Sequence, residues 1–248
     1  MPNSNCLRLS VWSGPRNIST ALMYSFAQRA DTRVVDEPLY GHYLSLSHAD
    51  HPGRDEVIAA MENDGERVVR EVILGPCDRP VLFLKNMSHH LMELDWAFLN
   101  QLTNVLLIRN PKEMLPSLAE NLAQPILRDT GYKFQVELLD YLLDRGQTPP
   151  VLEARELLTN PASVLRQLCE RIGLPFDQAM LHWPAGARPE DGLWAKYWYH
   201  NLHRSTGFMP YRPKTDPFPP HLHPLLDECR PYYERLLSYT IKAEPVTD

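Results

Sequence analysis

Four short runs of apolar residues in the first half of the chain are typical of buried β-strands. They lie at residues 6–12, 32–35, 80–84 and 104–108. The last two runs, PVLFL and NVLLI, are apolar throughout, as central strands of a parallel sheet usually are. Residues 19–29 carry apolar side chains at helical spacing directly after the first run. Strand, loop and helix in this order open a parallel α/β unit.

Further helix signals follow in the second half of the chain. Asn110 offers an N-cap, with proline at the first helical position and glutamate at the third. Asn160 and the proline after it repeat this signal, and Gly173 marks the end of that helix. An apolar stripe predicts a terminal helix within residues 220–239, and a cluster of prolines predicts irregular chain over residues 209–225.

This alternation predicts the α/β fold class, with helices on both faces of a central, mostly parallel sheet in three α/β/α layers. We find no domain boundary and expect a single domain over residues 1–248. Each of the four strands ends in a polar or charged residue. In open parallel sheets, ligands bind beyond the carboxyl ends of the strands. We therefore expect four residues to converge on one site: Ser13, Asp36, Lys85 and Arg109.

Composition excludes several classes of function. The net charge of −6 argues against a nucleic-acid partner, which usually requires a basic face. The four cysteines are far apart, which favours reduced thiols over a disulfide framework or a zinc site. The N-terminal residues lack the pattern of a signal peptide, and no apolar run is long enough to span a membrane. We expect a cytoplasmic protein with no membrane partner.

The loop between the first strand and the first helix carries groups that suit an anion. A helix N-terminus has unpaired N–H groups and about half a positive charge. Arg16 adds a full charge with a bidentate fork, and Ser19 and Thr20 add hydroxyl donors. The alternative is that Ser19 only caps the helix and Arg16 lies on the surface. The loop is not a Walker A sequence, because glycine is scarce and the Walker lysine is missing.

A second candidate anion site combines Arg109 at a strand end with Ser117, eight residues later. If Asn110 caps the helix, Ser117 lies two turns in, on nearly the same face as the cap. Arg109 and Ser117 could then hold one phosphate from two sides. Equally, Arg109 could cap the sheet edge while Ser117 faces solvent.

Both segments resemble phosphate-binding motifs of the sulfotransferase family. Residues 15–20, Pro-Arg-Asn-Ile-Ser-Thr, are similar to the 5′-phosphosulfate loop P-K-S-G-T-T, with arginine, asparagine and isoleucine in place of lysine, serine and glycine. Residues 109–117 resemble the 3′-phosphate motif, and residues 151–177 resemble a strand and capped helix common in that family. In detail the chain is similar to the bacterial branch and to the domain fused to aminotransferase-like proteins in plants.

The resemblance implies a P-loop NTPase-like fold and a specific transfer reaction. A sulfuryl group would pass from 3′-phosphoadenosine 5′-phosphosulfate (PAPS), the co-substrate, to a hydroxyl or amine of a small-molecule acceptor. The two motifs and a late basic segment would bind PAPS: Arg16, Asn17, Ile18, Ser19, Thr20, Arg109, Ser117 and Arg204. Three aromatic residues could form a wall against the adenine or belong to the core: Trp194, Tyr197 and Trp198.

The acceptor needs a base for its proton, and three candidates follow strand ends. Glu37 follows the second strand, where carboxylates serve as bases in some family members, such as those acting on carbohydrates. His89 and His90 follow Lys85, although the histidine base of cytosolic members lies closer to its lysine. The resemblance implies that Lys85 stabilises the leaving phosphate. Alternatively, Glu37 is salt-bridged, the histidines cap the next helix and the lysine lies at a strand edge.

Two other functions fit parts of the sequence. A kinase or NTPase would bind ATP with Mg²⁺, for which Asp36 is the only strand-end aspartate. A non-catalytic nucleotide-binding module is favoured by Arg16 and Ile18, which replace the family's lysine and glycine. Sulfate carries less charge than phosphate, so no metal is required in principle, and the metal-like spacing of His200 and His203 lacks a third ligand.

The acceptor itself is left open by the sequence. The family builds acceptor pockets from loops, here expected between Glu37 and Pro80 and beyond Gln178, where we find no diagnostic pattern. The oligomeric state is also open, because the dimer motif of cytosolic members is not present.

Overall fold

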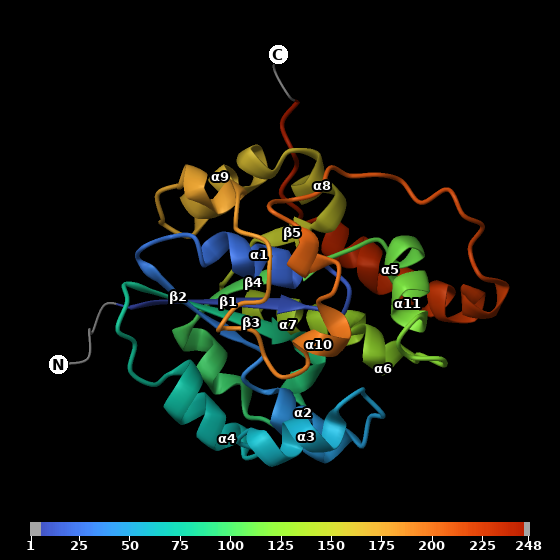
Figure 1. Cartoon of the computed structure of the whole chain (residues 1–248), viewed down its shortest axis with the longest axis horizontal. Coiled ribbons are helices and arrows are strands. Elements are labelled where there is room, and N and C mark those ends of the chain that lie inside the picture. Colours follow the sequence, from blue (N-terminus) through green and yellow to red (C-terminus); the bar gives the residue numbers. More distant parts are fainter. Residues whose placement is uncertain (1–5, 246–248) are drawn as a thin grey trace.

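The centre of the molecule is a five-stranded, all-parallel sheet with the strand order β2-β3-β1-β4-β5 (Figure 1). The computed structural model describes residues 6–245, and the first five residues, where we expected no signal peptide, lie outside that range. The strands are β1 (Leu7–Ser13), β2 (Thr32–Asp36), β3 (Val81–Met87), β4 (Thr103–Ile108) and β5 (Val151–Glu153). The four apolar runs therefore predicted four strands correctly, and the fifth lies in the segment identified through the family resemblance.

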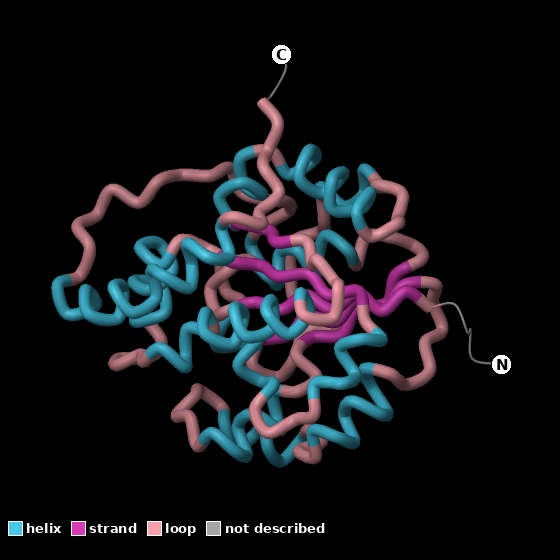
Figure 2. Tube along the Cα trace, turned by 180° about the vertical axis from the view of Figure 1, so that it is seen from behind, coloured by secondary structure: helices cyan, strands magenta, loops and turns pink. Residues whose placement is uncertain are grey.

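Helices cover both faces of this sheet, so the predicted three-layer, P-loop NTPase-like architecture is confirmed (Figures 1 and 2). The α-helices are α1 (Ser19–Phe26), α2 (Tyr40–Ser47), α3 (Arg54–Ala60), α4 (Gly65–Val68), α5 (Pro111–Ala119), α6 (Leu127–Thr130), α7 (Tyr132–Leu143), α8 (Ala154–Thr159), α9 (Pro161–Arg171), α10 (Ala195–Trp198) and α11 (His223–Leu237). A π-helix spans Val69–Ile73, and 3₁₀ turns span Ser88–Leu91, Trp96–Gln101, Gln178–Leu181, Leu202–Arg204 and Pro220–Leu222.

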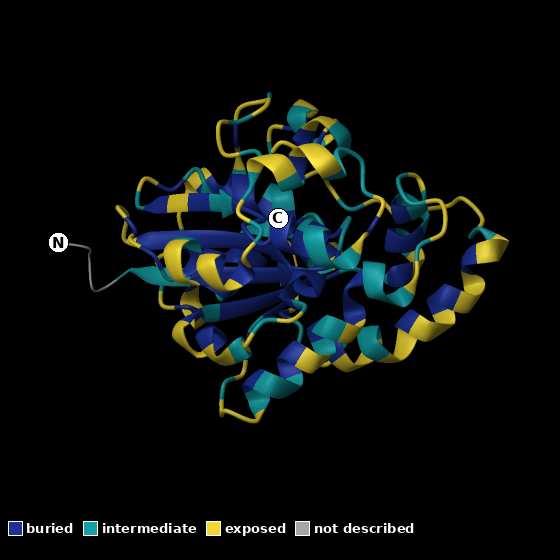
Figure 3. Ribbon diagram, turned by 90° about the horizontal axis from the view of Figure 1, so that it is seen from below, coloured by how far each residue is buried: buried dark blue, intermediate teal, exposed yellow. Residues whose placement is uncertain are grey.

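Successive side chains along each strand point to opposite faces of the sheet, and this divides the apolar core into two parts. Leu9 and Val11 of β1 pack with α1, α8 and α9, whereas Trp12 packs with α5, α7 and α11. Phe83 and its neighbour Leu84 on β3 divide in the same way. This is the period of two that a strand imposes on its side chains. Figure 3 shows the strands buried, with the exposed residues gathered on the outer sides of the helices.

A third apolar cluster lies where α2, α3 and α10 meet. It contains Tyr43 and Leu44 of α2, Val57 of α3, and Trp194 and Tyr199 at the ends of α10. The expectation of loops between residues 37 and 80 was wrong, because α2, α3, α4 and the π-helix occupy much of this stretch. These helices are short, and α2 contains glycine, histidine and tyrosine, which are weak helix formers, so the sequence carried little signal.

Two predicted boundaries also differ from the structure. Helix α1 ends at Phe26 rather than near residue 29. The stretch expected to be irregular up to residue 225 contains a 3₁₀ turn and the start of α11 at His223. Proline is tolerated in the first turn of a helix, where its missing N–H has no partner to lose.

The sequence predicted reduced cysteines and no membrane-spanning segment. All four cysteines lie within it, and all four are free thiols. Among residues 6–245, the structure contains no helix with both the length and the apolar character needed to cross a bilayer.

Candidate functional site

A cavity of about 320 Å³ opens at the carboxyl ends of the strands. The loop after β1, the ends of β2, β3 and β4, the last turn of α5 and the segment 194–209 contribute to its wall. Most of the site residues predicted from the sequence line it: Arg16, Asn17, Ile18, Ser19, Thr20, Glu37, Lys85, His89, His90, Arg109 and Ser117. Two of the four strand-end residues, Ser13 and Asp36, are instead buried and do not line the cavity.

The loop after β1 has the backbone of an anion-binding turn. Arg16 has a φ of 59° and Ile18 a φ of 60°, so both adopt the left-handed conformation. Turns that contain left-handed residues form concave nests of N–H groups that bind anions. Ile18 is also the N-cap of α1, and Ser19 is the first residue of the helix rather than its cap. Isoleucine therefore adopts here the conformation that glycine would adopt, at a cost of roughly 1–2 kcal/mol.

Buried contacts from two neighbouring elements hold this loop in place. Asn17 donates from Nδ2 to the carbonyl oxygen of Leu107 at 3.2 Å, so its side chain anchors the loop to β4. Gln135 of α7 donates from Nε2 to the same carbonyl at 2.9 Å and to that of Trp12 at 3.1 Å. Gly14 lies against the carbonyl oxygen of Thr130, where a Cβ would clash. The Nδ2 contact of Asn17 thus holds the loop in position, while its Oδ1 has no hydrogen-bond partner within the described chain.

The two predicted anion sites meet within the cavity. Arg16 donates from Nε to Ser117 Oγ at 2.9 Å. Arg109 donates from Nη1 to the carbonyl oxygen of Arg16 at 3.0 Å and lies 3.4 Å from Glu113 Oε2. One small ligand could therefore contact Arg16 and Arg109 together.

Positive charge accumulates at this end of the cavity. Burial lowers the pKa of the Arg16 guanidinium below its usual value, with the charge of Glu120 opposing this shift and that of Arg109 adding to it. Burial and the charge of Arg109 also lower the pKa of Lys214. An anion would relieve this repulsion between cations. The sequence did not reveal Lys214, because it lies in the proline-rich stretch that carries no motif.

At the other end of the cavity, one buried lysine is surrounded by acceptors. Lys85 donates from Nζ to Asp36 Oδ1 at 2.8 Å, to the Tyr199 hydroxyl at 2.7 Å and to Glu37 Oε1. A lysine has three donors, and all three are used here. The structure thus leaves Lys85 no free donor for a leaving phosphate, and in that role it would first have to give up one of these partners.

Glu37 lines the cavity with a carboxylate suited to accept a proton. Its backbone has a φ of 41°, and its N–H donates to the carbonyl oxygen of Lys85 at 2.8 Å. Burial raises the pKa of Glu37 to about 7, with Lys85 opposing and Asp36 reinforcing the shift. A general base works best when its pKa lies near the working pH. Glu37 is therefore salt-bridged to Lys85, and its raised pKa would suit a general base.

The two histidines are buried in an aromatic stack. The ring of His90 stacks on Tyr43 with centroids 4.6 Å apart, and that of His89 meets Tyr43 edge-on at 4.7 Å. Burial lowers the pKa of His89 to about 3 and that of His90 well below its usual value. Both form the 3₁₀ turn after β3, so neither caps the next α-helix. Neutral rings with such low pKa values are weak bases.

The aromatic residues of the C-terminal third divide between wall and core. Trp194 and Trp198 line the cavity, although Trp194 also belongs to the cluster of α2, α3 and α10. Tyr197 does not line the cavity, and its ring packs against Gly53 instead. The packing alternative thus holds for Trp194 and Tyr197, whereas contact of Trp194 or Trp198 with an adenine stays a prediction.

Arg204 lies outside the site predicted for it. It is exposed, does not line the cavity, and donates from Nε to the carbonyl oxygen of His200 at 3.3 Å. The similarity of this segment to the family's late basic motif was loose, so spacing alone placed Arg204 near the phosphate. In this structure Lys214 is the basic residue from the later part of the chain that lies near Arg109.

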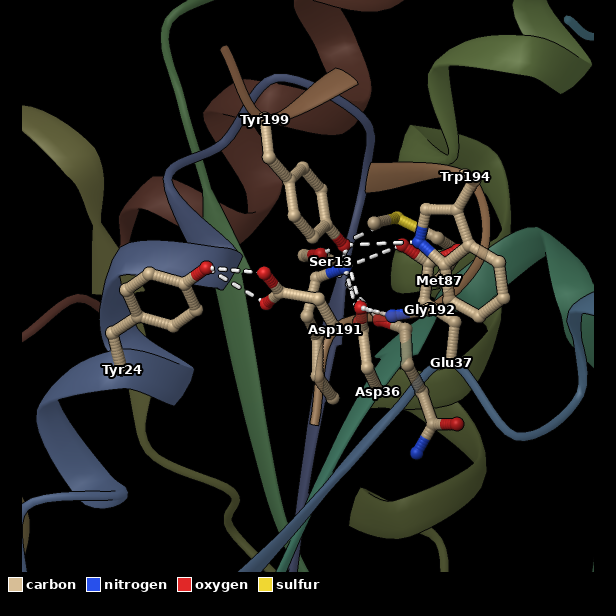
Figure 4. A network of polar contacts seen from close by, with 11 residues as sticks. Ser13, Tyr24, Asp36, Glu37, Met87, Asp191, Gly192, Trp194 and Tyr199 are labelled. Carbon is tan, nitrogen blue, oxygen red and sulfur yellow. Dashed lines mark hydrogen bonds and ion pairs between the residues drawn. The ribbon is translucent and has the colours of Figure 1, made fainter. Parts of the chain in front are cut away.

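The part of the cavity wall contributed by the last third of the chain, together with the residues that precede it, is called the C-terminal wall (residues 188–209). Contacts that the sequence did not predict join it to α1 and β2 (Figure 4). Tyr24 of α1 donates to both carboxylate oxygens of Asp191, at 2.7 and 2.8 Å. Asp191 also lies 3.0 Å from His203 Nε2, and the N–H of the next residue, Gly192, donates to Asp36 Oδ2 at 3.2 Å. His203 thus has a carboxylate partner, and residues 6–245 contain no group of three or more potential metal-ligating residues.

Comparison with known proteins agrees with the fold and the two motifs. A family model described as "Sulfotransferase domain" matches residues 7–239. Two proteins of Arabidopsis thaliana, "Branched-chain-amino-acid aminotransferase-like protein 2" and "protein 1", are 41% and 42% identical to this chain over 229 residues. The match covers 92% of this chain and 41% of each relative, so the chain spans about two fifths of their length.

A solved structure supports the architecture. The crystal structure of a sulfotransferase from Alicyclobacillus acidocaldarius aligns with a TM-score of 0.52 at 13% identity, covering 94% of both chains. At this identity the likeness concerns the fold alone. The family match, by contrast, spans residues 7–239, nearly the whole chain, and so includes both segments that resemble the family's motifs. The chain therefore belongs to the sulfotransferase domain family.

Proposed function

We propose that this protein transfers a sulfuryl group from PAPS to a hydroxyl or amine of a small-molecule acceptor. The observation that carries the proposal is the meeting of two basic motifs at the Arg16–Ser117 contact, in one cavity that also contains Glu37. Family membership supports a sulfotransferase, and the geometry supports a donor with two separate anionic groups.

The residues present fit such a donor. The left-handed turn at Arg16 and Ile18, the first N–H groups of α1 and the hydroxyls of Ser19 and Thr20 suit the 5′-phosphosulfate. Arg109 and Ser117 suit the 3′-phosphate, and Arg16 and Ser117 would exchange their mutual hydrogen bond for contacts with the nucleotide. Three apolar side chains in the same wall suit the adenine ring: Leu158, Phe208 and Met209.

When bound, PAPS supplies an activated sulfuryl group. The protein's own residues then position the reactants and neutralise the charge that develops during transfer. The acceptor oxygen or nitrogen forms a bond to sulfur while the bond from sulfur to the phosphate oxygen breaks. Glu37 takes the acceptor's proton, which neutralises its carboxylate. Lys85, then paired with one charged carboxylate instead of two, can offset the charge that develops on the leaving phosphate. The N–H groups of the first loop hold the same charge from the other side.

The rival functions are weakened by particular contacts. A metal-dependent kinase or NTPase would need Asp36, whose two carboxylate oxygens already accept bonds from Lys85, Tyr199 and Gly192. A non-catalytic module was favoured by isoleucine at the glycine position. Ile18 nevertheless adopts the positive φ that a glycine would adopt, so the substitution does not by itself count against a binding loop.

Calorimetry and a transfer assay test the proposal. We expect adenosine 3′,5′-bisphosphate, the product nucleotide, to bind more tightly than ATP with Mg²⁺. The transfer of labelled sulfate from PAPS to a panel of phenols, sugars and amines is then measured. Transfer to any of them would distinguish an enzyme from a non-catalytic nucleotide-binding module. Binding of ATP with Mg²⁺ without binding of the bisphosphate would reject the proposal.

A further inference from the structure

Two buried carboxylates share one lysine beside the cavity, and they have different surroundings. Asp36 is surrounded by donors: Lys85 contacts Oδ1, while the Tyr199 hydroxyl at 2.8 Å and the Gly192 N–H at 3.2 Å contact Oδ2. Glu37 uses only Oε1 for its side-chain hydrogen bond within the described chain, and it lines the cavity. The pair therefore divides into one carboxylate held by the protein and one that faces the cavity.

The Tyr199 hydroxyl holds the lysine and the buried aspartate together. It accepts from Lys85 Nζ at 2.7 Å and from Trp194 Nε1 at 3.0 Å, and it donates to Asp36. These three contacts use its one donor and both acceptor lone pairs. Trp194, Tyr199 and Asp36 all lie close together in Figure 4. The hydroxyl is thus fixed in one orientation, with its proton directed at Asp36.

We propose that Asp36 and Tyr199 are positioning residues for proton transfer, which hold the charge of Lys85 so that Glu37 remains free to accept the acceptor's proton. The proposal rests on the proposed sulfotransferase function and deepens it. Its physical basis is that one ammonium charge shared between two carboxylates stabilises each of them less than if it belonged to one.

The groups around Glu37 agree with this division. Asp36 precedes it on β2, Lys85 approaches from β3, Tyr40 from α2, and Tyr199 from the residue after α10. The one cation among them is Lys85. Burial lowers the pKa of the nearby His90, so its ring adds no positive charge.

The same contacts tie Glu37 to the wall of the cavity. Trp194 and Tyr199 line the cavity, and Gly192 belongs to the same segment. An acceptor that orders this segment would thus also order the hydrogen bonds on Asp36. This predicts that damage to the Tyr199 contact lowers kcat more than it changes the KM for PAPS, whose binding residues lie on other elements.

The decisive variants are Asp36→Asn and Tyr199→Phe, with Asp140→Asn and Tyr232→Phe as matched controls far from the cavity. In Asp36→Asn, the lysine's charge is left to Glu37 alone, so we expect the pKa of Glu37 to fall from about 7 toward its ordinary 4.5. Tyr199→Phe frees one lysine donor for Glu37, which shifts the pKa in the same direction but by less, because Asp36, having lost one donor, draws more on the same lysine. A carboxylate of lower pKa is a weaker base, so kcat at neutral pH should fall roughly tenfold or more.

Two readouts separate this inference from the proposed function. The acid limb of kcat/KM against pH should move to lower pH in both variants and remain in place in both controls. Independently of activity, ¹³C NMR of protein labelled at glutamate Cδ, with Glu37 assigned from Glu37→Gln, titrates the carboxylate directly. An unchanged Glu37 titration in Tyr199→Phe, or in a folded Asp36→Asn, overturns the inference whether or not any acceptor is turned over. A shifted titration without transfer to any acceptor would support the charge sharing and count against the transfer function alone.

If Asp36→Asn fails to fold, shown by circular dichroism, Tyr199→Phe decides the question. Removing one partner of a buried ion pair is often strongly destabilising, whereas loss of one hydroxyl is milder. A Tyr199→Phe enzyme with an unmoved acid limb and unchanged kcat would show that the hydroxyl is only structural.

Discussion

The guanidinium groups of Arg16 and Arg109 lie in one cavity, and the backbone carbonyl of Arg16 is itself a hydrogen-bond acceptor for Arg109. Arg109 therefore supports the first loop, and under the proposed function it would also offer its charge to the 3′-phosphate. Sequence spacing correctly brought these residues to one place. It could not show that the two motifs contact each other, since that depends on how β1 and β4 pair.

The first prediction concerns Arg109→Ala. A hydrogen bond to a charged group contributes about 1.5–3 kcal/mol, so affinity for adenosine 3′,5′-bisphosphate should fall roughly 10- to 150-fold. Isothermal titration calorimetry measures the change. Arg145→Ala, at an exposed arginine after the end of α7 that does not line the cavity, is the control and should bind as the parent does. Equal affinity of Arg109→Ala and the parent protein for the bisphosphate would show that Arg109 does not bind this nucleotide.

The second prediction separates the candidate bases. Because Glu37 has a pKa of about 7, kcat/KM should be constant above that pH and fall below it, as the carboxylate takes a proton and can no longer accept one. Glu37→Gln should lower kcat by about 10²–10⁴-fold. His89→Asn should lower it less than about tenfold, because a ring with a pKa of about 3 is a poor base. The reverse ranking, measured with labelled PAPS across pH 5–9, would assign the base to the histidine.

At the scale of elements, the sequence predicted the sheet better than the helices beside the site. Buried strands are apolar throughout, so the apolar runs predicted β3 and β4. Asn110 and Asn160 both cap helices as expected. Helix α2 has an aromatic, glycine-containing sequence, and only tertiary packing against α3 and α10 makes it helical. Short helices of this kind gain most of their stability from packing, which no local pattern reports.

The third prediction concerns the packing of the first loop against the α6–α7 turn. Gly14→Ala puts a Cβ against the backbone carbonyl of Thr130, which cannot move without shifting Gly131. Overpacking of this kind costs roughly 1–3 kcal/mol, or about 2–12 °C in Tm for a domain of this size. Gly146→Ala is the contrasting control, because its Cβ meets open space and only the positive φ is strained. We expect Gly14→Ala, but not Gly146→Ala, to weaken bisphosphate binding as well, and retained binding in both would contradict a role for this contact.

At the scale of the whole molecule, the candidate site is assembled from segments that are far apart in the sequence. Sequence motifs identified the residues at the strand ends, because strand order and sheet topology fix the positions of those residues. The motifs missed Tyr199, Asp191 and Lys214, which reach the same region from the C-terminal third. No motif contains these three residues, and their contacts with residues far away in the sequence follow only from the completed fold. For the same reason Arg204, placed by loose similarity alone, was assigned to a site that it does not line.

The C-terminal wall depends on Asp191, whose buried carboxylate holds α1 through Tyr24 and the wall through His203. Asp191→Ala leaves the Tyr24 hydroxyl without this partner, at a cost of about 1–3 kcal/mol. It also frees the neighbouring Gly192, whose N–H donates to Asp36. We therefore expect the segment 188–207 to open locally while the sheet stays folded, because the core on both faces of the sheet is untouched.

Hydrogen–deuterium exchange with mass spectrometry measures this opening directly. In Asp191→Ala, peptides from residues 188–207 should exchange faster, while peptides from β1 and β4 keep their protection. Asp227→Asn, an exposed carboxylate on α11, should change neither. Uniformly faster exchange would mean that Asp191 stabilises the whole fold rather than the wall. Unchanged exchange would mean that the apolar packing of Trp194 and Tyr199 alone holds the segment, and that its hydrogen bonds to Asp36 survive without Asp191.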